Sequence, residues 1–285
     1  MNPVALWFAD GSAFFAGLTL VLATGVLFLR FGTHRVGRPV LAVLLPVGLL
    51  TVAASGTPLP LWLYLLWAAP AVAIPFMARK AGMRRLGVGA CVWLAAATGV
   101  MLVLELPHRA APQIKVTKGS AVYVIGDSLS AGMFERERSW PVVLGGRVPL
   151  RVVNLARPGA TLQSARLQAG GIMEPGSLAS LEIGGIDFLE MVGADRFQER
   201  LEALVLDLHR RGCRILMFEL PLPPFWNAYG RAQRDVARAN GVMLLPKHGF
   251  ASVLGADGAT SDGLHFSPAG HEAVAALVAG VITVQ

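Results

Sequence analysis

The sequence has little charge and almost no cysteine. Asp, Glu, Lys and Arg make up 15% of its 285 residues, whereas 54% are hydrophobic. With a mean hydropathy of +0.56, this balance excludes a single soluble domain as the whole chain. The two cysteines, Cys91 and Cys213, are too few for a disulfide framework, and we expect both to be buried free thiols.

Charge is absent above all from three long runs in the first third of the chain. The uncharged runs are Ala13–Leu29, Pro39–Ala78 and Leu86–Leu104. The middle run is long enough for two membrane spans, and Ser55–Pro58 is a turn signal at its centre. We therefore predict an all-α region, residues 1–106, with four transmembrane helices at about residues 12–30, 38–55, 58–78 and 86–106.

The positive charges predict how these helices are oriented. They lie between spans one and two and between spans three and four, at Arg30, Arg35, Arg38, Arg79, Lys80, Arg84 and Arg85. Both basic loops should be cytoplasmic, which leaves the rest of the chain after Glu105 outside. We predict a multi-pass protein of a bacterial-type inner (cytoplasmic) membrane, with its second domain on the periplasmic or outer side. A cleaved signal peptide is not expected, because no basic segment precedes the first span.

The net charge of +7 does not indicate a nucleic-acid partner. It divides into +5 up to Glu105 and +2 beyond it, so most of it belongs to the loops that set membrane orientation. No nucleic-acid role is assigned.

Beyond a polar linker at residues 107–120, the pattern is typical of one α/β domain over residues 121–285. Short buried strands are expected at Leu150–Leu155, Leu181–Ile183, Ile215–Phe218 and Val242–Leu245. Helical patterns alternate with them, the clearest at Asp195–Arg211. This alternation predicts a parallel sheet with helices on both faces and a ligand site at the carboxyl ends of its strands.

The first candidate catalytic residue follows a buried strand. The apolar run Val122–Ile125 ends at Gly126 and Asp127, which supply a turn. Ser128 then lies on a strand-to-helix elbow, where its hydroxyl would be exposed. The alternative is a turn serine that only caps the next helix.

A second constellation lies near the end of the chain. Asp262 and His265 are three residues apart in a predicted loop, a spacing that lets the carboxylate hold Nδ1 of the imidazole while Nε2 acts as a base. The alternative is an Asx-type turn with an exposed histidine. We expect a structural or rim role for the rival base, His271, while His209 and His248 have no acidic partner nearby in sequence.

These stretches resemble the four blocks of the GDSL, or SGNH, hydrolases. The blocks are GDSLS at Gly126–Ser130, NLARPGAT at Asn154–Thr161, LEIGGID at Leu181–Asp187 and DGLH at Asp262–His265. The resemblance is to the lysophospholipase and thioesterase I-like esterases, and covers nearly everything from Ala121 onward. It implies a flavodoxin-like three-layer parallel sheet, with no metal and no cofactor.

The resemblance also implies residue roles. Ser128 would be the nucleophile, His265 the base and Asp262 its orienting acid. The amides of Ser128 and Gly159 would donate to the oxyanion. Further candidate pocket residues are Asp127, Leu129, Asn154, Gly185, Ile186 and Asp187.

One block departs from the family pattern. Where the family has GGND, with an asparagine as third oxyanion donor, this chain has Ile186, and loss of one such donor costs about 2.7 to 4 kcal/mol in the transition state. Asn227 or backbone amides near Gly184 are the candidate replacements. We also keep open that Ile186 lines an acyl-binding wall, or that the domain binds without turnover.

The predicted function is that of a membrane-anchored serine ester hydrolase. Its substrates would be acyl esters of lipids, thioesters or O-acylated glycans outside the cytoplasmic membrane. One alternative is an acyltransferase that passes the acyl group to a glycan through the same triad, and the other is a catalytically impaired binding domain.

Overall fold

The computed structural model describes residues 2–31, 37–77, 81–133 and 137–285. They form two compact units. The α/β unit contains the N-terminal residues up to Leu6, Ala110–Pro221 and Ala228–Gln285, and the helical unit contains Trp7–Arg109 and Leu222–Asn227. Both cysteines are buried and free, as predicted.

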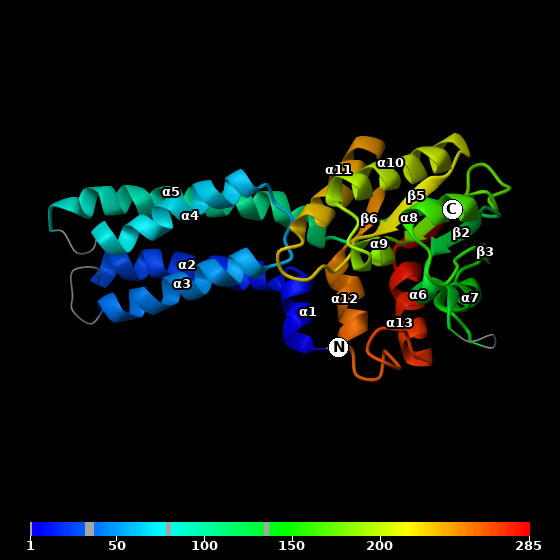
Figure 1. Ribbon diagram of the computed structural model, residues 1–285, viewed down its shortest axis with the longest axis horizontal. Coiled ribbons are helices and arrows are strands. Elements are labelled where there is room, and N and C mark those ends of the chain that lie inside the picture. The colour runs from blue at the N-terminus through cyan, green and yellow to red at the C-terminus, as the bar shows by residue number, and fades with distance from the viewer. Residues whose placement is uncertain (1, 32–36, 78–80, 134–136) are drawn as a thin grey trace. The chain divides into compact units, whose positions relative to one another are not determined.

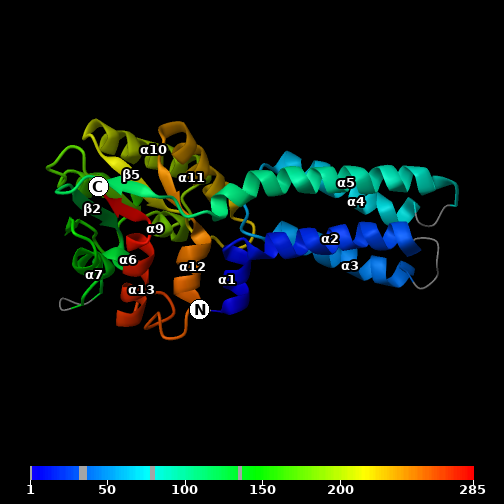
Figure 2. The ribbon, with the colours of Figure 1, turned by 180° about the vertical axis from the view of Figure 1, so that it is seen from behind.

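Four apolar helices build the helical unit, each within a few residues of its predicted position. They are α2 (Ser12–Phe31), α3 (Gly37–Ala54), α4 (Leu61–Met77) and α5 (Arg84–Glu105). The shorter helices of this part of the sequence are α1 (Pro3–Ala9), which is divided between the two units, η1 (Ala81–Met83) and η2 (Leu106–Arg109). Figures 1 and 2 show α2 beside α3 and α4 beside α5.

Among the described residues, two helices are long and apolar enough to be membrane spans, where the sequence predicted four. Ser12–Phe31 and Arg85–Arg109 are long and apolar enough to cross a membrane, each with a mean hydropathy of 2.1, whereas Pro39–Ala54 and Leu61–Met77 are shorter. Of the basic residues used to predict orientation, Arg35, Arg79 and Lys80 lie outside the described residues.

Glycines bring α2 and α3 into close contact. A Cβ atom placed on Gly17 would lie 2.6 Å from a methyl group of Val52 and 2.8 Å from the carbonyl oxygen of Gly48. A Cβ atom on Gly48 would lie 2.8 Å from Val21. Small residues let helix backbones approach in this way, so no larger side chain fits at this crossing.

The α/β unit contains a parallel sheet of five strands in the order β3-β2-β4-β5-β6. The strands are β2 (Ala121–Gly126), β3 (Arg151–Asn154), β4 (Leu178–Glu182), β5 (Arg214–Phe218) and β6 (Met243–Leu245). This order is flavodoxin-like, because the chain first adds a strand on one side of β2 and then continues on the other. The predicted strands are confirmed, although β4 begins three residues before its expected start at Leu181.

Helices cover both faces of this sheet, which makes the three predicted layers. In Figures 1 and 2, α10 (Ala194–Arg210) and α11 (Asn227–Asn240) lie on one side, and α12 (Lys247–Gly255) and α13 (Pro268–Ala279) lie on the other. The remaining helices are α6 (Ser128–Ala131), α7 (Trp140–Arg147), α8 (Leu162–Ala169) and α9 (Gly185–Leu189). The amphipathic pattern of α10 explains its position, because its apolar stripe is buried: Phe197, Leu201, Leu204, Val205 and Leu208.

The predicted linker at residues 107–120 is partly wrong. Within it, β1 (Ile114–Val116) pairs in parallel with β7 (Ile282–Val284) as a second, two-stranded sheet. Ile114 and Val116 are buried, with Lys115 exposed between them. The alternation that marks a strand spans only three residues here, too few to separate it from a loop by pattern.

We predict that Gly17→Ala destabilises the helical unit by about 1 to 3 kcal/mol, because the added methyl group overlaps backbone atoms of α3. The measurement is thermal unfolding in detergent. Gly99→Ala in α5 is the matched control, since a Cβ atom there meets nothing within 4 Å. Equal stability of the two variants would contradict the close packing of α2 and α3.

Candidate active site

The elbow predicted at Ser128 is present at the carboxyl end of β2. The strand ends at Gly126, Asp127 caps the next helix and Ser128 is its first residue. Asp127 Oδ1 accepts a hydrogen bond from the amide of Leu129 at 3.0 Å. Ser128 and Leu129 are half-buried, whereas the strand before them is fully buried. The turn therefore carries the serine from the core to the surface.

A buried polar network supports this elbow from beneath. Ser130 Oγ donates to Glu182 Oε2 at 2.7 Å and accepts from Trp140 Nε1 at 3.0 Å. Gln168 satisfies both backbone groups of Gly126, with both distances 3.0 Å. Sequence reasoning missed Glu182, although a carboxylate inside a buried strand is itself a signal, since charged groups are almost never fully buried unless paired.

Burial raises the pKa values of two carboxyls at this elbow. It raises the pKa of Asp127 to about 6, against the opposing effects of the Leu129 amide and the charge of His265. Burial, together with the charge of Asp127, also raises the pKa of Glu182 well above its usual range. The protein interior behind Ser128 therefore disfavours negative charge.

The predicted Asp262–His265 pair is formed within one loop. Asp262 Oδ2 lies 2.7 Å from His265 Nδ1, and Asp262 Oδ1 accepts from the amides of His265 at 2.7 Å and Leu264 at 2.9 Å. The hydrogen bond from the imidazole, followed by those from the amides, lowers the pKa of Asp262 below its usual range. Asp262 thereby fixes the imidazole so that Nε2 is left to accept a proton.

The loop that carries this pair is held by its neighbours. The amide of Ser267 donates to the carbonyl of Ala259 at 2.9 Å, and Ser267 caps α13. A Cβ atom on Gly270 would lie 2.0 Å from the same carbonyl oxygen, so only glycine fits there. His265 lies near enough to Asp127 for its charge to lower the pKa of that carboxyl. Among the described residues, no hydrogen bond joins Ser128 Oγ to His265.

The loop after β3 runs along the elbow. The amide of Leu155 donates to the carbonyl of Val124 at 2.8 Å, and that of Arg157 to the carbonyl of Gly126 at 3.1 Å. Gly159 follows with φ +71°, which glycine adopts without strain. Within the part of the chain that the structure describes, the amides of Ser128 and Gly159 donate to no acceptor. Two N–H donors, one on the elbow and one on the loop after β3, are thus available.

Two of the predicted pocket residues make contacts that hold the surrounding structure. The Asn154 amide donates to the carbonyl of Ser130 at 2.9 Å and so braces the elbow helix. Asp187 is fully buried, accepts from the amide of Leu162 at 2.7 Å and pairs with Arg200 at 3.1 Å. Asp187 is therefore closed off from solvent, whereas Asn154 is half-buried.

The block Leu181–Asp187, which has Ile186 where the family has an asparagine, lies beside the elbow. A Cβ atom on Gly185 would be 3.6 Å from Asp127 Oδ2, and Ile186 is half-buried in the first turn of α9. Asn227, one suggested replacement donor, instead donates to the carbonyl of Ser55 at 3.0 Å within the helical unit. The amides at the start of α9 therefore remain as candidates.

His271 has the structural role predicted for it. It is buried, its Nδ1 accepts from the amide of Trp140 at 3.1 Å, and its Nε2 lies 3.2 Å from Glu137. Among the described residues, no three His, Cys, Asp or Glu side chains come together as a metal site would require.

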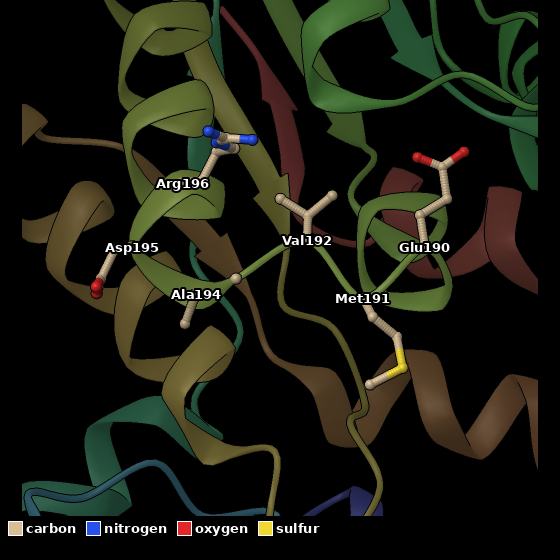
Figure 3. A pocket seen from close by; sticks show the side chains of 7 residues that line it. Glu190, Met191, Val192, Ala194, Asp195 and Arg196 are labelled. Atoms are coloured by element: carbon tan, nitrogen blue, oxygen red, sulfur yellow. The ribbon is translucent and has the colours of Figure 1, made fainter.

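A hollow of about 560 Å³ lies along the loop between α9 and α10, lined by residues 190–196. Figure 3 shows Met191 and Val192 with their side chains on opposite sides of this loop. The lining contains none of the predicted site residues, so the hollow is separate from the elbow.

Comparison with known proteins identifies the family of the α/β unit. A model of the GDSL-like Lipase/Acylhydrolase family matches residues 124–273, which is more than half of the chain. The chain is similar to the solved structure of TesA, with 24% identity and a TM-score of 0.52 over 57% of this chain and 97% of the other. It is similarly related to a putative lipolytic protein of the G-D-S-L family from Desulfitobacterium hafniense, with 24% identity and a TM-score of 0.50 over 57% of this chain and 99% of the other.

No curated protein matches the chain. The two solved structures share its fold, and the family match includes the elbow, the loop after β3 and the Asp262–His265 pair. The chain belongs to the GDSL-like lipase/acylhydrolase family and is a serine carboxylic ester hydrolase.

Proposed function

We propose that this chain is a membrane-anchored serine esterase in which Ser128, His265 and Asp262 form the catalytic triad. The observation that carries this proposal is the 2.7 Å contact of Asp262 with His265 Nδ1, in the same α/β unit as the strand-to-helix elbow of Ser128. A nucleophile, a base and an acid that orients the base are the parts needed for acyl transfer through a covalent intermediate.

The reaction follows from these positions. Ser128 Oγ attacks the acyl carbonyl while its proton passes to His265 Nε2. The resulting oxyanion accepts hydrogen bonds from the amides of Ser128 and Gly159. As the C–O bond to the alcohol breaks, His265 returns the proton to the leaving oxygen, and a water molecule then hydrolyses the acyl-serine by the same route.

The oxyanion hole of this enzyme lacks a side-chain donor at Ile186. Two backbone donors remain, and the amides of Gly185 and Ile186 lie in the first turn of α9, where helix N–H groups have no intrahelical acceptor. We infer that catalysis here is slower than in a site with asparagine at this position.

Membrane anchoring by all four helices is the second part of the proposal. Each helix exposes large apolar side chains on its outer surface, including Val26, Val43, Leu50, Leu65, Phe76, Val92 and Val103. An apolar exterior of this kind is stable in lipid and not in water. At 18 and 17 residues, α3 and α4 reach the lower end of the length that spans a bilayer.

The basic loops place the α/β unit on the periplasmic or outer side in this proposal, where it would act on acyl esters of lipids, thioesters or O-acylated glycans. A reporter that is active only in the periplasm, fused after Gln285, is expected to be active. An active cytoplasmic reporter at the same position would overturn this orientation.

We predict that Ser128→Ala abolishes ester hydrolysis and labelling by a fluorophosphonate probe, because the probe reacts only with an activated serine. Both are measured on the full chain in detergent. Ser252→Ala is the matched control, since that hydroxyl lies on the surface of α12 and donates to the carbonyl of Gly249. Labelling that persists in Ser128→Ala would contradict the assignment of Ser128 as the nucleophile.

We predict that Ile186→Asn raises kcat about 10-fold or more, because the amide supplies the third donor to the oxyanion. Steady-state kinetics on a soluble ester gives the value. Ile186→Leu keeps an apolar side chain and is expected to leave kcat within about threefold, since it adds no hydrogen-bond donor. If a folded Ile186→Asn variant showed no faster turnover, a backbone amide would already be the third hydrogen-bond donor to the oxyanion.

A further inference from the structure

Arg157 is a positively charged residue of the loop after β3, two residues before the proposed oxyanion donor Gly159. The proposed mechanism gives it no role. Arg157 begins a tight turn with Pro158, Gly159 and Ala160, closed by a hydrogen bond from the Ala160 amide to the Arg157 carbonyl at 3.2 Å. Proline at the second position and a left-handed glycine at the third are typical of a type II turn. The Arg157 backbone is thus rigid and two residues from a proposed oxyanion donor.

The same residue is bound to the elbow. Its amide donates to the carbonyl of Gly126 at 3.1 Å, two residues before Ser128. Because Pro158 follows it, Arg157 is restricted to extended backbone conformations. Its long side chain therefore starts from a fixed backbone position at the carboxyl end of β2.

Among the described residues, no acidic side chain forms an ion pair with Arg157. Many of the described arginines of the α/β unit are paired with acids: Arg147 with Glu272, Arg151 with Glu174, Arg166 and Arg210 with Asp207, Arg200 with Asp187, Arg234 with Glu219, and Arg238 with Asp235. Arg157 is exposed, and across the described ranges its side chain makes no ion pair and no hydrogen bond.

The acidic groups at the site are already committed. Asp127 is buried, with only 4% of its surface exposed, and it caps α6. Both oxygens of Asp262 are bound to the histidine loop. The guanidinium is therefore left for a group that arrives from solution.

We propose that Arg157 binds an anionic group of the substrate, so that the enzyme prefers acyl esters with a phosphate or carboxylate close to the ester bond. This inference rests on the proposed function. Guanidinium binds phosphate and carboxylate through two parallel hydrogen bonds, which gives orientation as well as affinity. Such a contact would position the ester carbonyl over Ser128.

The experiment compares pairs of esters that differ in one charge and share an acyl chain. The first pair is a monoacylglycerol and its 3-phosphate, and the second is an acetylated hexose and the matching acetylated uronic acid. For the full chain in detergent, the readout is the ratio of kcat/KM for the anionic ester to that for the neutral ester.

Arg157→Gln is expected to lower this ratio about 10-fold or more for at least one pair, and Arg157→Lys to lower it less, since the charge remains but the paired geometry is lost. The pair that responds identifies phosphate or carboxylate as the natural group. Arg211→Gln is the control. That exposed arginine follows α10 at the amino end of β5, whereas Ser128 lies at the carboxyl ends of the strands.

Two results would overturn the proposal. An unchanged ratio for both pairs would show that no substrate anion is bound, and an equal loss on neutral and anionic esters would show that the guanidinium acts on the oxyanion alone. If the wild type hydrolyses no ester, the proposed function fails, and equilibrium binding of the same pairs to Ser128→Ala still tests Arg157. Selective loss of anionic binding on adding Arg157→Gln would then support it.

Discussion

The absence of a side chain at Gly126 is the constraint on which the candidate site depends. A Cβ atom there would lie 2.7 Å from both the Glu182 carbonyl oxygen and Ser130 Oγ. Without it, β2 and β4 remain paired up to the last residue of β2, and the elbow helix turns directly over the strand end. The backbone groups of Gly126 in turn bind Gln168 and the loop after β3. The elbow, the loop after β3 and the buried network are thus assembled around one glycine.

Features that depend on residues close in sequence could be predicted. The apolar run of β2 predicts a strand, and the Gly126–Asp127 turn predicts an elbow, because each is decided by local backbone preferences. The spacing of Asp262 and His265 predicts their contact for the same reason. The sheet order could not be worked out from spacing and came from the resemblance to a family, which also supplied the candidate role of Gly159.

Features that depend on distant residues could not be predicted. Nothing near Asp187 in the sequence shows that its carboxylate is buried between the start of α8 and Arg200. The role of Glu182 likewise requires Ser130 and Trp140 to meet it in space. The number of membrane spans is a separate case. Both α3 and α4 are apolar enough for a span, but they are at the lower end of the length that crosses a bilayer, so the apolar pattern and the helix length give different numbers of candidate spans.

The pairing of β1 with β7 has a consequence for the order of folding. These strands lie at opposite ends of the α/β unit's sequence, so their contact closes the longest loop of any strand pair there. Loop-closure entropy has to be lost before such a contact contributes stability, which makes it a late event. The five-stranded sheet can form before β1 pairs with β7. During synthesis, the segment next to α5 therefore stays unpaired until the strand after α13 has emerged, and a chaperone or protease could reach it in that interval.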